Sequence, residues 1–267
     1  MSPLQVYVGG VGLWSPQLAN FAALRAWLAG SPMPSPAARP PAATLPANER
    51  RRAPESVLLA VEVAGQAVAM SGRQASELAC VFSSAHGDQA ITDYMCETLA
   101  REPSGLSPTR FHNSVHNAPA GYWTIATGCH APSAAVCGGQ LAIVGAGLLE
   151  AAMQALADQR AVLLVCSDIA GAGPLGEMTD STQAFGCALV LTPHPGPRSL
   201  ARLNLTLAPK QAPTSSTSSP IPMAWHDANA TAKAALPLLL LLAGHGTHYN
   251  LATADMLGLD IHWESAA

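Results

Sequence analysis

The stretch Phe111 to Ala157, FHNSVHNAPAGYWTIATGCHAPSAAVCGGQLAIVGAGLLEAAMQALA, decides the fold of this chain. It opens with a polar segment rich in His and Asn, passes through a turn of small residues and closes in a long apolar helix. Cys137 and Gln140 both stand at the turn that precedes this helix. Which of the two occupies the position of a nucleophile decides what the chain can do chemically.

The segments on either side of this stretch alternate between strand and helix patterns. Short apolar runs bounded by polar residues predict strands, and apolar residues at helical spacing predict helices. The predicted strands are 4–14, 77–83 and 159–165, and the predicted helices are 18–28, 55–70 and 89–99. This alternation favours a mostly parallel sheet in a layered α/β architecture.

The last third of the chain predicts a different arrangement. Residues 185–192 and 198–207 read as two strands, adjacent and antiparallel across a turn rich in Pro and Gly. A Ser, Thr and Pro rich stretch at 209–222 predicts a mobile surface loop, and the Pro and Ala rich segment 30–46 predicts a surface excursion without regular structure. Residues 229–243 predict a helix that ends at Gly244, and 249–263 predict either a closing hairpin or a short helix and strand.

Composition limits the classes of partner. Only 11% of the 267 residues are charged and the net charge is -4, which argues against nucleic acid and anionic membrane surfaces. The N-terminus lacks a basic region and a cleavage signature, so we expect a cytoplasmic protein. Six scattered cysteines without a CxxC pair predict free thiols, and the apolar run ALPLLLLLA at 235–243 is too short to span a bilayer.

Cys137 has the surroundings expected of a reactive thiol. A helix N-terminus stabilises a thiolate, and Gly138 and Gly139 would let a backbone N–H approach an acyl oxygen. Such a cysteine needs an imidazole, and His112 and His116 stand four residues apart in the polar segment. The plainer interpretation is a packed cysteine and two histidines that bond loop backbone or a subunit boundary. No pattern predicts a metal site.

Two further motifs have ordinary structural interpretations. The loop SSAHGD at 83–88 follows a predicted strand at the end where α/β proteins bind ligands, although a plain loop is the default. The sequence GHGTH at 244–248 looks like a catalytic HGT motif. Only nineteen residues follow His248, so we expect a turn that ends a helix.

The central motifs carry a family resemblance. NSVHNAPAGYWTI at 113–125, GCHAPS at 128–133 and the small-residue helix that follows resemble the N-terminal half of a β-ketoacyl-acyl-carrier-protein synthase. FHNSVHNAPAGYW at 111–123, with GLLEAA at 147–152, is similar to the short synthase-like proteins of bacterial aryl polyene clusters, which are chain-length-factor partners of a full synthase. The resemblance implies a thiolase-like layered α/β/α fold, truncated relative to full ketosynthases.

The resemblance extends over about residues 1–207, which we expect to form a ketosynthase N-terminal-like domain. Residues 208–228 form the Ser/Thr/Pro-rich loop in this division, and 229–267 supply a C-terminal helix and closing strands of the same domain. Full synthases carry two catalytic histidines in a C-terminal half that this chain is too short to contain. Autonomous condensation is therefore not expected, and the resemblance implies no cofactor.

The alignment of this chain with the family's nucleophile position also argues against autonomous condensation. Counting without gaps from Ala120 and Gly121, the family's active cysteine falls on Gln140, and counting back from 162–165 agrees within a residue. Chain-length factors resemble synthases in which glutamine replaces that cysteine. Cys137 fits the position only if the turn is shortened by three residues.

These expectations define a primary function and an alternative. The primary function is a non-catalytic, chain-length-factor-like partner that forms a heterodimer with a β-ketoacyl synthase, shapes its acyl tunnel in aryl polyene or polyketide (fatty-acid-like) biosynthesis, and meets acyl carrier protein through that complex. The expected interface and tunnel residues are Phe111, Asn113, His116, Asn117, Tyr122, Trp123 and Gln140. The alternative is an acyltransferase or thioesterase for acyl carrier protein, dependent on Cys137 with His112, His116 or His86 as base.

Overall fold

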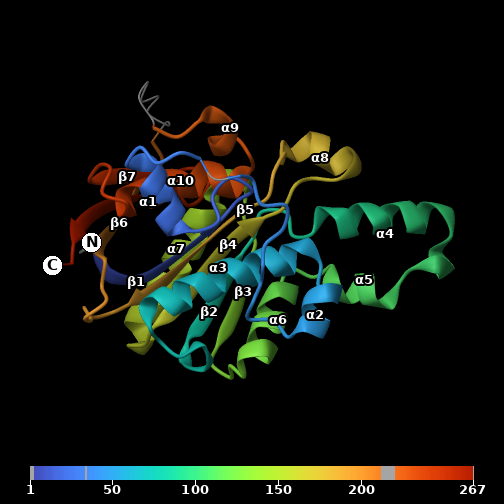
Figure 1. Ribbon diagram of the computed structural model, residues 1–267, viewed down its shortest axis with the longest axis horizontal. Helices are drawn as coiled ribbons and strands as arrows, with labels where there is room; N and C mark the ends of the chain where they lie inside the picture. The colour runs from blue at the N-terminus through green and yellow to red at the C-terminus, as the bar shows by residue number, and fades with distance from the viewer. Residues whose placement is uncertain (1–2, 34, 212–219, 267) are drawn as a thin grey trace.

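One mixed sheet with helices on both faces forms the body of the protein (Figure 1). The structure is a computed structural model, which describes residues 3–33, 35–211 and 220–266. Within them the sheet has eight strands in the order β3-β2-β4-β5-β1-β6-β8-β7. The strands are β1 (Leu4–Trp14), β2 (Ala79–Ser83), β3 (Ser133–Val136), β4 (Val162–Asp168), β5 (Phe185–Thr192), β6 (Ala201–Pro209), β7 (His248–Ala252) and β8 (Leu257–Ser265).

Two hydrophobic cores lie on opposite faces of this sheet. One contains the apolar residues of α3 (Glu55–Ser71) and the buried side of α6 (Ala118–Thr127). The other contains α1 (Phe21–Leu28), α7 (Ile143–Asp158) and α10 (Ala230–Leu242). The layered α/β/α fold is confirmed, and the central strands β4 and β5 are buried along their whole length because both faces are covered.

The close contact between α3 and β1 depends on two glycines in β1. A Cβ on Gly10 would overlap the carbonyl oxygen of Ala67, and one on Gly12 would overlap that of Val63. The predicted strand at 4–14 and the predicted helix at 55–70 are both confirmed, within one residue for the helix. The glycines explain how an eleven-residue strand lies so close beneath a helix.

The strand directions correct the prediction of a mostly parallel sheet. β2 pairs in parallel with β3 and β4, whereas the other neighbouring pairs in the described sheet are antiparallel. The parallel strands are those joined by long helical crossovers, which parallel pairing requires. Periodicity identifies the strands but not the direction in which the later ones enter the sheet.

The predicted adjacency of β5 and β6 is wrong, because β1 lies between them. Tyr7 of β1 pairs with Thr192 of β5, and Leu4 pairs with Leu205 of β6. The connection between β5 and β6 contains Pro193, Pro195 and Pro197, whose fixed backbone angles and missing N–H groups disfavour a tight hairpin. The apolar first strand takes the central place instead.

The C-terminal elements extend the same sheet. α10 begins after Asn229, whose side chain accepts a hydrogen bond from the Ala232 N–H at 2.8 Å. The helix ends before Gly244, with φ of +89°, and His248 starts β7, so the interpretation of 244–248 as a helix-ending turn is confirmed. β7 and β8 form the predicted hairpin, and β8 pairs with β6.

Of the predicted loop at 209–222, residues 212–219 lie outside the described part of the chain. The short helix α9 (Met223–His226) follows it. The run at 235–243 lies within or at the end of α10, and no helix in the described ranges is long and apolar enough to cross a bilayer.

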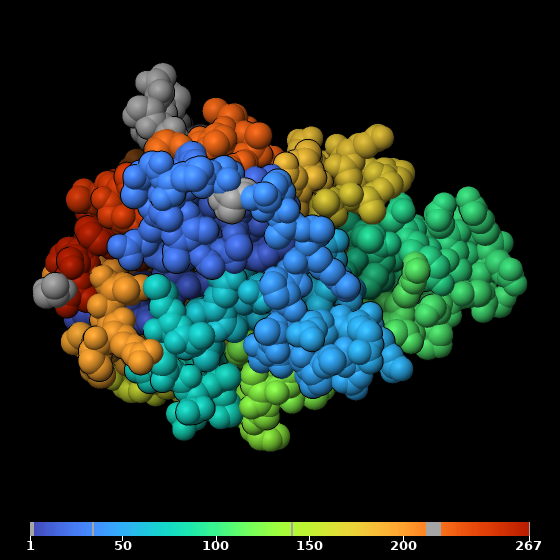
Figure 2. All heavy atoms as spheres, viewed as in Figure 1, coloured from blue at the N-terminus to red at the C-terminus, as the bar shows by residue number. Residues whose placement is uncertain are grey.

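The remaining helices lie around the carboxyl ends of β2 and β4. They are α2 (Ala47–Arg52), α4 (Gln89–Arg101), α5 (Pro108–Asn113) and α8 (Gly173–Thr179), with the short 3₁₀ turns η2 (Pro103–Gly105) and η3 (Gln140–Ala142). A further 3₁₀ turn, η1 (Ala75–Glu77), precedes β2 at its amino end. α4 and α5 project from the body as an arm, visible at the right of Figures 1 and 2. This arm gives the polar segment at 111–117 a surface position next to β3.

Candidate functional site

The turn between β3 and α7 contains Cys137 and Gln140. The sequence leaves open which of these two residues stands at the nucleophile position. β3 ends at Val136, Cys137 follows as an exposed residue, and Gln140 opens the 3₁₀ turn that leads into α7. Both residues therefore lie between the end of a strand and the beginning of a sixteen-residue helix. The structure describes the backbone of Gln140 and not the position of its side chain.

Cys137 has an imidazole beside it. Its Sγ lies 3.9 Å from Nε2 of His116 and 3.9 Å from the carbonyl oxygen of Ala85. His116 also packs on Gly87, where a Cβ would come within 3.3 Å of the imidazole Cε1. Gly87 has φ of +63°, a conformation that costs other residues energy, so this loop shape favours glycine. The predicted pairing of Cys137 with His116 thus has a physical contact.

A buried carboxylate fixes the loop against which the thiol and imidazole lie. Asp168, at the end of β4, is 1% exposed, and its Oδ1 accepts hydrogen bonds from Ser84 Oγ at 2.8 Å and from the N–H groups of Ala85 and His86 at 3.0 and 3.1 Å. Thr231 Oγ1 donates to Oδ2 at 2.5 Å. A buried carboxylate is tolerated when several donors satisfy it. Asp168 therefore holds the loop at 84–87 in one conformation.

Asp168 was missed in the sequence, although a signal existed. β2 and β4 are parallel neighbours, so their carboxyl ends meet at one edge of the sheet. The loop at 83–88 follows the first strand and Asp168 ends the second. A polar residue at the end of one buried parallel strand should have been paired with the polar loop after the other.

The other predicted residues lie in different surroundings. Asn113 is 6% exposed and its Oδ1 has no hydrogen-bond partner among the described residues, nor does the buried Nε2 of His86. Trp123 is 1% exposed and belongs to the core beneath α3. Phe111 is 57% exposed. The predicted interface set is thus partly surface and partly core.

His112 faces a groove instead of Cys137. The groove has a volume of about 430 Å³ and runs between the segment around α2 and the helices α5 and α6. It is lined by Leu45, Pro46, Glu49, His112, Val115, Asn117, Ala118, Gly121, Tyr122, Ile125 and Ala126. Among the three proposed bases His112, His116 and His86, only His116 has a contact with Cys137 in the described residues, so the geometry favours His116.

Burial separates the six cysteines into two groups. Cys80, Cys129, Cys166 and Cys187 are buried, and Cys96 and Cys137 are exposed; all six are free thiols, as predicted. Burial raises the pKa of the Cys80 thiol to about 12. A hydrogen bond with Cys187 and burial raise the pKa of Cys166 well above its usual range. The thiols of Cys80 and Cys166 therefore stay protonated and unreactive.

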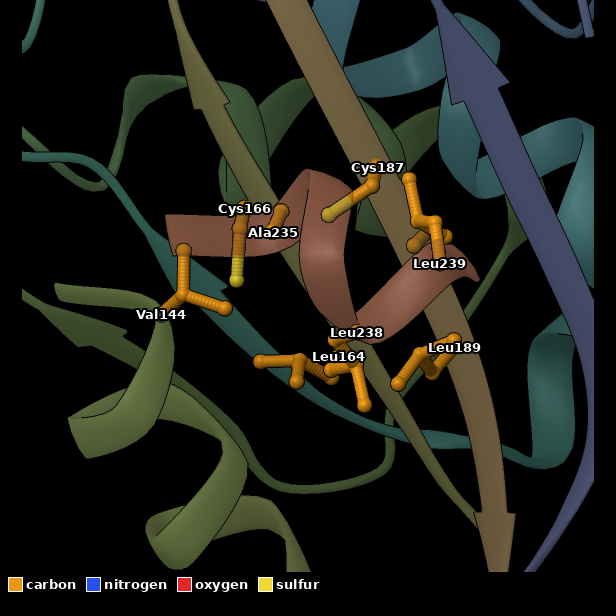
Figure 3. A pocket seen from close by; sticks show the side chains of 9 residues that line it. Val144, Leu164, Cys166, Cys187, Leu189, Ala235, Leu238 and Leu239 are labelled. Carbon is orange, nitrogen blue, oxygen red and sulfur yellow. The ribbon is translucent and has the colours of Figure 1, made fainter. Parts of the chain in front are cut away.

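The cavity beside Cys166 and Cys187 has no room for a ligand. The two sulfur atoms line a wholly apolar space between β4, β5 and α10, with Leu164, Leu189 and Leu239 around it (Figure 3). Its volume is about 10 Å³, roughly that of one water molecule. Across the residues that the structure describes, no group of three or more His, Cys, Asp or Glu side chains is placed to hold a metal ion.

Comparisons with known proteins give the family context of this geometry. A solved structure of the ketosynthase ApeO in complex with its chain length factor ApeC from Xenorhabdus doucetiae matches with a TM-score of 0.69 and 22% identity, over 97% of this chain and 99% of the matched chain. The AntDE:AntF structure, a type II PKS acyl-carrier protein in complex with its ketosynthase, matches with a TM-score of 0.69 and 14% identity over 98% and 99%. The ishigamide ketosynthase/chain length factor matches with a TM-score of 0.55 and 16% identity over 90% and 74%.

At these identities the three structures establish a shared fold. No curated protein matches the sequence. The family "Beta-ketoacyl synthase, N-terminal domain" matches residues 25–252, most of the chain and all of the site described above. The resemblance seen in the central motifs is therefore confirmed, and the chain belongs to the β-ketoacyl synthase family, through its N-terminal domain.

Proposed function

We propose that this chain is a non-catalytic, chain-length-factor-like subunit that pairs with a β-ketoacyl-acyl-carrier-protein synthase in the cytoplasm. In this role it shapes the acyl tunnel of the pair during aryl polyene or polyketide (fatty-acid-like) biosynthesis, and acyl carrier protein reaches it through the complex. The observation that carries the proposal is the free edge of β3, together with exposed apolar side chains on α5, on α6 and in the turn between them. The relatives described as ketosynthase and chain length factor complexes support the same arrangement.

The edge of β3 is ready to pair with another strand. Cys80 N–H donates to the Pro132 carbonyl and Ser84 N–H donates to the Val136 carbonyl, at 2.9 and 3.3 Å. In a parallel ladder alternate residues face the same neighbour, so Ala135 turns its N–H and carbonyl away from β2. The strand carries only Ser, Ala and Val, with no charge to discourage pairing. A bare, uncharged edge of this kind favours an intermolecular strand contact.

Exposed apolar side chains on α5, on α6 and in the turn between them provide the rest of the proposed interface. Ile125 is 84% exposed, Phe111 57% and Val115 48%. Val115 and Ile125 line the groove of about 430 Å³, and Phe111 precedes them on α5. Large exposed apolar residues gathered in one region mark a protein contact more often than a free surface. The proposed partner would bury them.

The absence of condensing activity in this proposal rests on Gln140. The ungapped count places Gln140 where the family has its nucleophile, and an amide cannot attack a thioester or carry an acyl group. The chain would then contribute the wall of a tunnel, and the partner would contribute the chemistry.

Co-expression with the candidate synthase tests this function. We expect a stable pair, and we expect Gln140→Trp to shorten the product by at least one extension unit because the larger side chain fills tunnel space. Met256→Trp is the matched control, since Met256 is 80% exposed in the β7–β8 turn, and it should leave product length unchanged. Mass spectrometry measures the length of the product that each variant forms with the synthase.

Two outcomes would contradict the proposal. One is a chain that stays monomeric in the presence of every synthase encoded beside it. The other is a pair whose product formation is abolished by Cys137→Ala, because the thiol would then be part of the synthase reaction and the subunit would be catalytic.

A further inference from the structure

Two buried thiols meet at one carbonyl group between β2 and the end of α6. Cys80 Sγ donates to the carbonyl oxygen of Leu78 at 3.2 Å, and Cys129 Sγ donates to the same oxygen at 3.3 Å. Two sulfur atoms that share one acceptor at these distances are close neighbours. Burial and the adjacent Cys129 thiol together raise the pKa of Cys80 to about 12. The chain thus contains a dithiol that has no part in the proposed function.

We propose that Cys80 and Cys129 form a reversible disulfide when the protein meets a small oxidised disulfide such as oxidised glutathione. The bond would tie the start of β2 to the connection that leads from α6 into β3. These two segments already lie against each other, because Cys80 N–H donates to the Pro132 carbonyl at 2.9 Å and Cys80 pairs with Ser133. The inference rests on this dithiol and does not depend on the proposed function.

Cys129 is the thiol of the pair that an oxidant can reach. It is 5% exposed, whereas Cys80 is 0% exposed. Its neighbours in the sequence, Gly128 and His130, are both exposed. Gly128 ends α6 with φ of +63°, and β3 begins at Ser133, so Cys129 belongs to a short surface connection. Local opening of such a connection uncovers the thiol and leaves the sheet in place.

The exchange balances in two steps. The thiolate of Cys129 attacks one sulfur of the small disulfide, the sulfur–sulfur bond of that molecule breaks, and one small thiol leaves with the Cys129 proton. Cys80 then attacks Cys129 Sγ, the bond from that sulfur to the small thiol breaks, and the second small thiol leaves with the Cys80 proton. The two cysteines are oxidised, and the small disulfide is reduced to two thiols.

Cys80 reacts second because burial keeps its thiol protonated and unreactive toward molecules in solution. In the second step the sulfur that it attacks is already beside it, and such proximity replaces a high concentration of reagent.

Trp123 is a positioning residue for this second step. Its indole is 1% exposed, and its Nε1 has no hydrogen-bond partner in the described chain. Burial has the larger effect on the pKa of Cys80 and raises it, whereas the neighbouring Trp123 lowers it. A thiolate at Cys80 would give this buried N–H the acceptor that it lacks.

A second pair of thiols in the same chain provides the control. Cys166 and Cys187 stand directly opposite each other on β4 and β5, and a hydrogen bond joins them. Both sulfur atoms face the closed apolar cavity beside α10 (Figure 3). The two strands are buried along their whole length, so the sheet itself must open before an oxidant reaches these thiols.

The test incubates the full chain, without any partner, in mixtures of reduced and oxidised glutathione. N-ethylmaleimide blocks the remaining thiols, and mass spectrometry of unreduced peptides identifies each bond. We expect the Cys80–Cys129 bond to form at least ~10-fold faster than a Cys166–Cys187 bond, because local opening costs less than opening of the sheet. In Cys80→Ser, a mixed disulfide of Cys129 with glutathione should accumulate. In Cys129→Ser, Cys80 should stay reduced.

Trp123→Phe examines the second step. The mixed disulfide at Cys129 should form at the wild-type rate, and its closure by Cys80 should slow roughly 10-fold because a donor to the thiolate is lost. A thermal melt of the reduced variant reports whether the fold is retained. Closure at the wild-type rate would overturn the role of Trp123.

Two results would overturn the disulfide itself. One is a chain in which the exposed Cys96 and Cys137 carry glutathione while no Cys80–Cys129 bond is detected. The other is an equal rate for the two buried pairs, because both bonds would then follow from unfolding of the sheet. Since no partner or product is measured, either result would leave the subunit proposal standing.

Discussion

The two edges of the sheet differ in every property that controls strand pairing. β3 ends the sheet on one side with Ser133, Ala134, Ala135 and Val136, which are small and uncharged residues. β7 ends it on the other side with polar side chains on its exposed face. Natural sheets protect free edges with charge and polarity when those edges are to stay free. The contrast favours the β3 edge over the β7 edge as the place where the proposed partner would pair.

Two polar side chains of β7, His248 and Asn250, contact β8 of the same hairpin. His248 pairs directly with His262 of β8, with ring centroids 4.7 Å apart, and its Nε2 lies 3.5 Å from Asp260 Oδ1. Asn250 also donates to Asp260. These contacts leave an edge covered by imidazole, amide and carboxylate groups. A second strand that approached it would have to remove their water.

A proline on the β3 edge should weaken the binding of the synthase more than any other change predicted here. Ala135→Pro removes an N–H that faces away from β2 and leaves the pairing with β2 intact, so the free chain should fold. We expect the affinity for the synthase to fall about 100-fold, or roughly 2.7 kcal/mol. Isothermal calorimetry of the purified subunits measures it.

The matched control lies on the other edge. In the antiparallel β7–β8 pair, Trp263 N–H donates to the Thr247 carbonyl, so the next residue, His248, directs its N–H outward. His248→Pro should change the affinity less than ~3-fold. Equal losses for the two prolines would show that the edges are not functionally distinct.

A charge introduced at the exposed apolar residue Ile125 should weaken the binding of the synthase by an intermediate factor. Ile125→Glu places a carboxylate on a residue that is 84% exposed, so the free chain should keep its stability. Burying that charge against the partner should weaken the complex roughly 10-fold, about 1.4 kcal/mol. Met256→Glu, on the β7 side and 80% exposed, is the comparison variant. If both variants weaken the pair alike, charge in general and not the β3 surface is responsible.

Loss of the contact between the imidazole rings of His248 and His262 should have the smallest effect, and that effect should be on the free energy of unfolding. His262→Ala removes one cross-strand contact, which contributes about 0.5 kcal/mol to the free energy of unfolding. Urea denaturation measures this change, and the affinity for the synthase should be unaltered. A weakened complex would instead assign β7 to the interface.

The sequence predicted elements better than their arrangement. Strand β1 and the helices α3 and α10 have periodicity and capping residues that are local, so they could be located within one or two residues. The position of β1 between β5 and β6 depends on contacts between residues almost two hundred positions apart, which no local pattern contains. The same holds for the mainly antiparallel pairing of the later strands.

The sequence predicted which residue types form the candidate site, a cysteine and a histidine. It did not predict which of the candidate histidines contacts the cysteine. Cys137 was identified from the glycines and helix that follow it, but His112 and His116 were equivalent in sequence because both precede α6 closely. The turn after α5 directs one to the thiol and the other to the groove. Asp168 acts from a different strand, so only the sheet register reveals its role.

The central place of β1 also constrains how the protein is made. The first strand leaves the ribosome before both of its neighbours, and its second neighbour is complete only after residue 209. At ~5–20 residues per second, synthesis of those roughly two hundred residues takes on the order of 10–40 s. During that time an apolar strand lacks its neighbours in the sheet, so its hydrophobic side chains stay exposed on the nascent chain. It also means that any truncation before β5 would release a chain whose first strand never finds its neighbours.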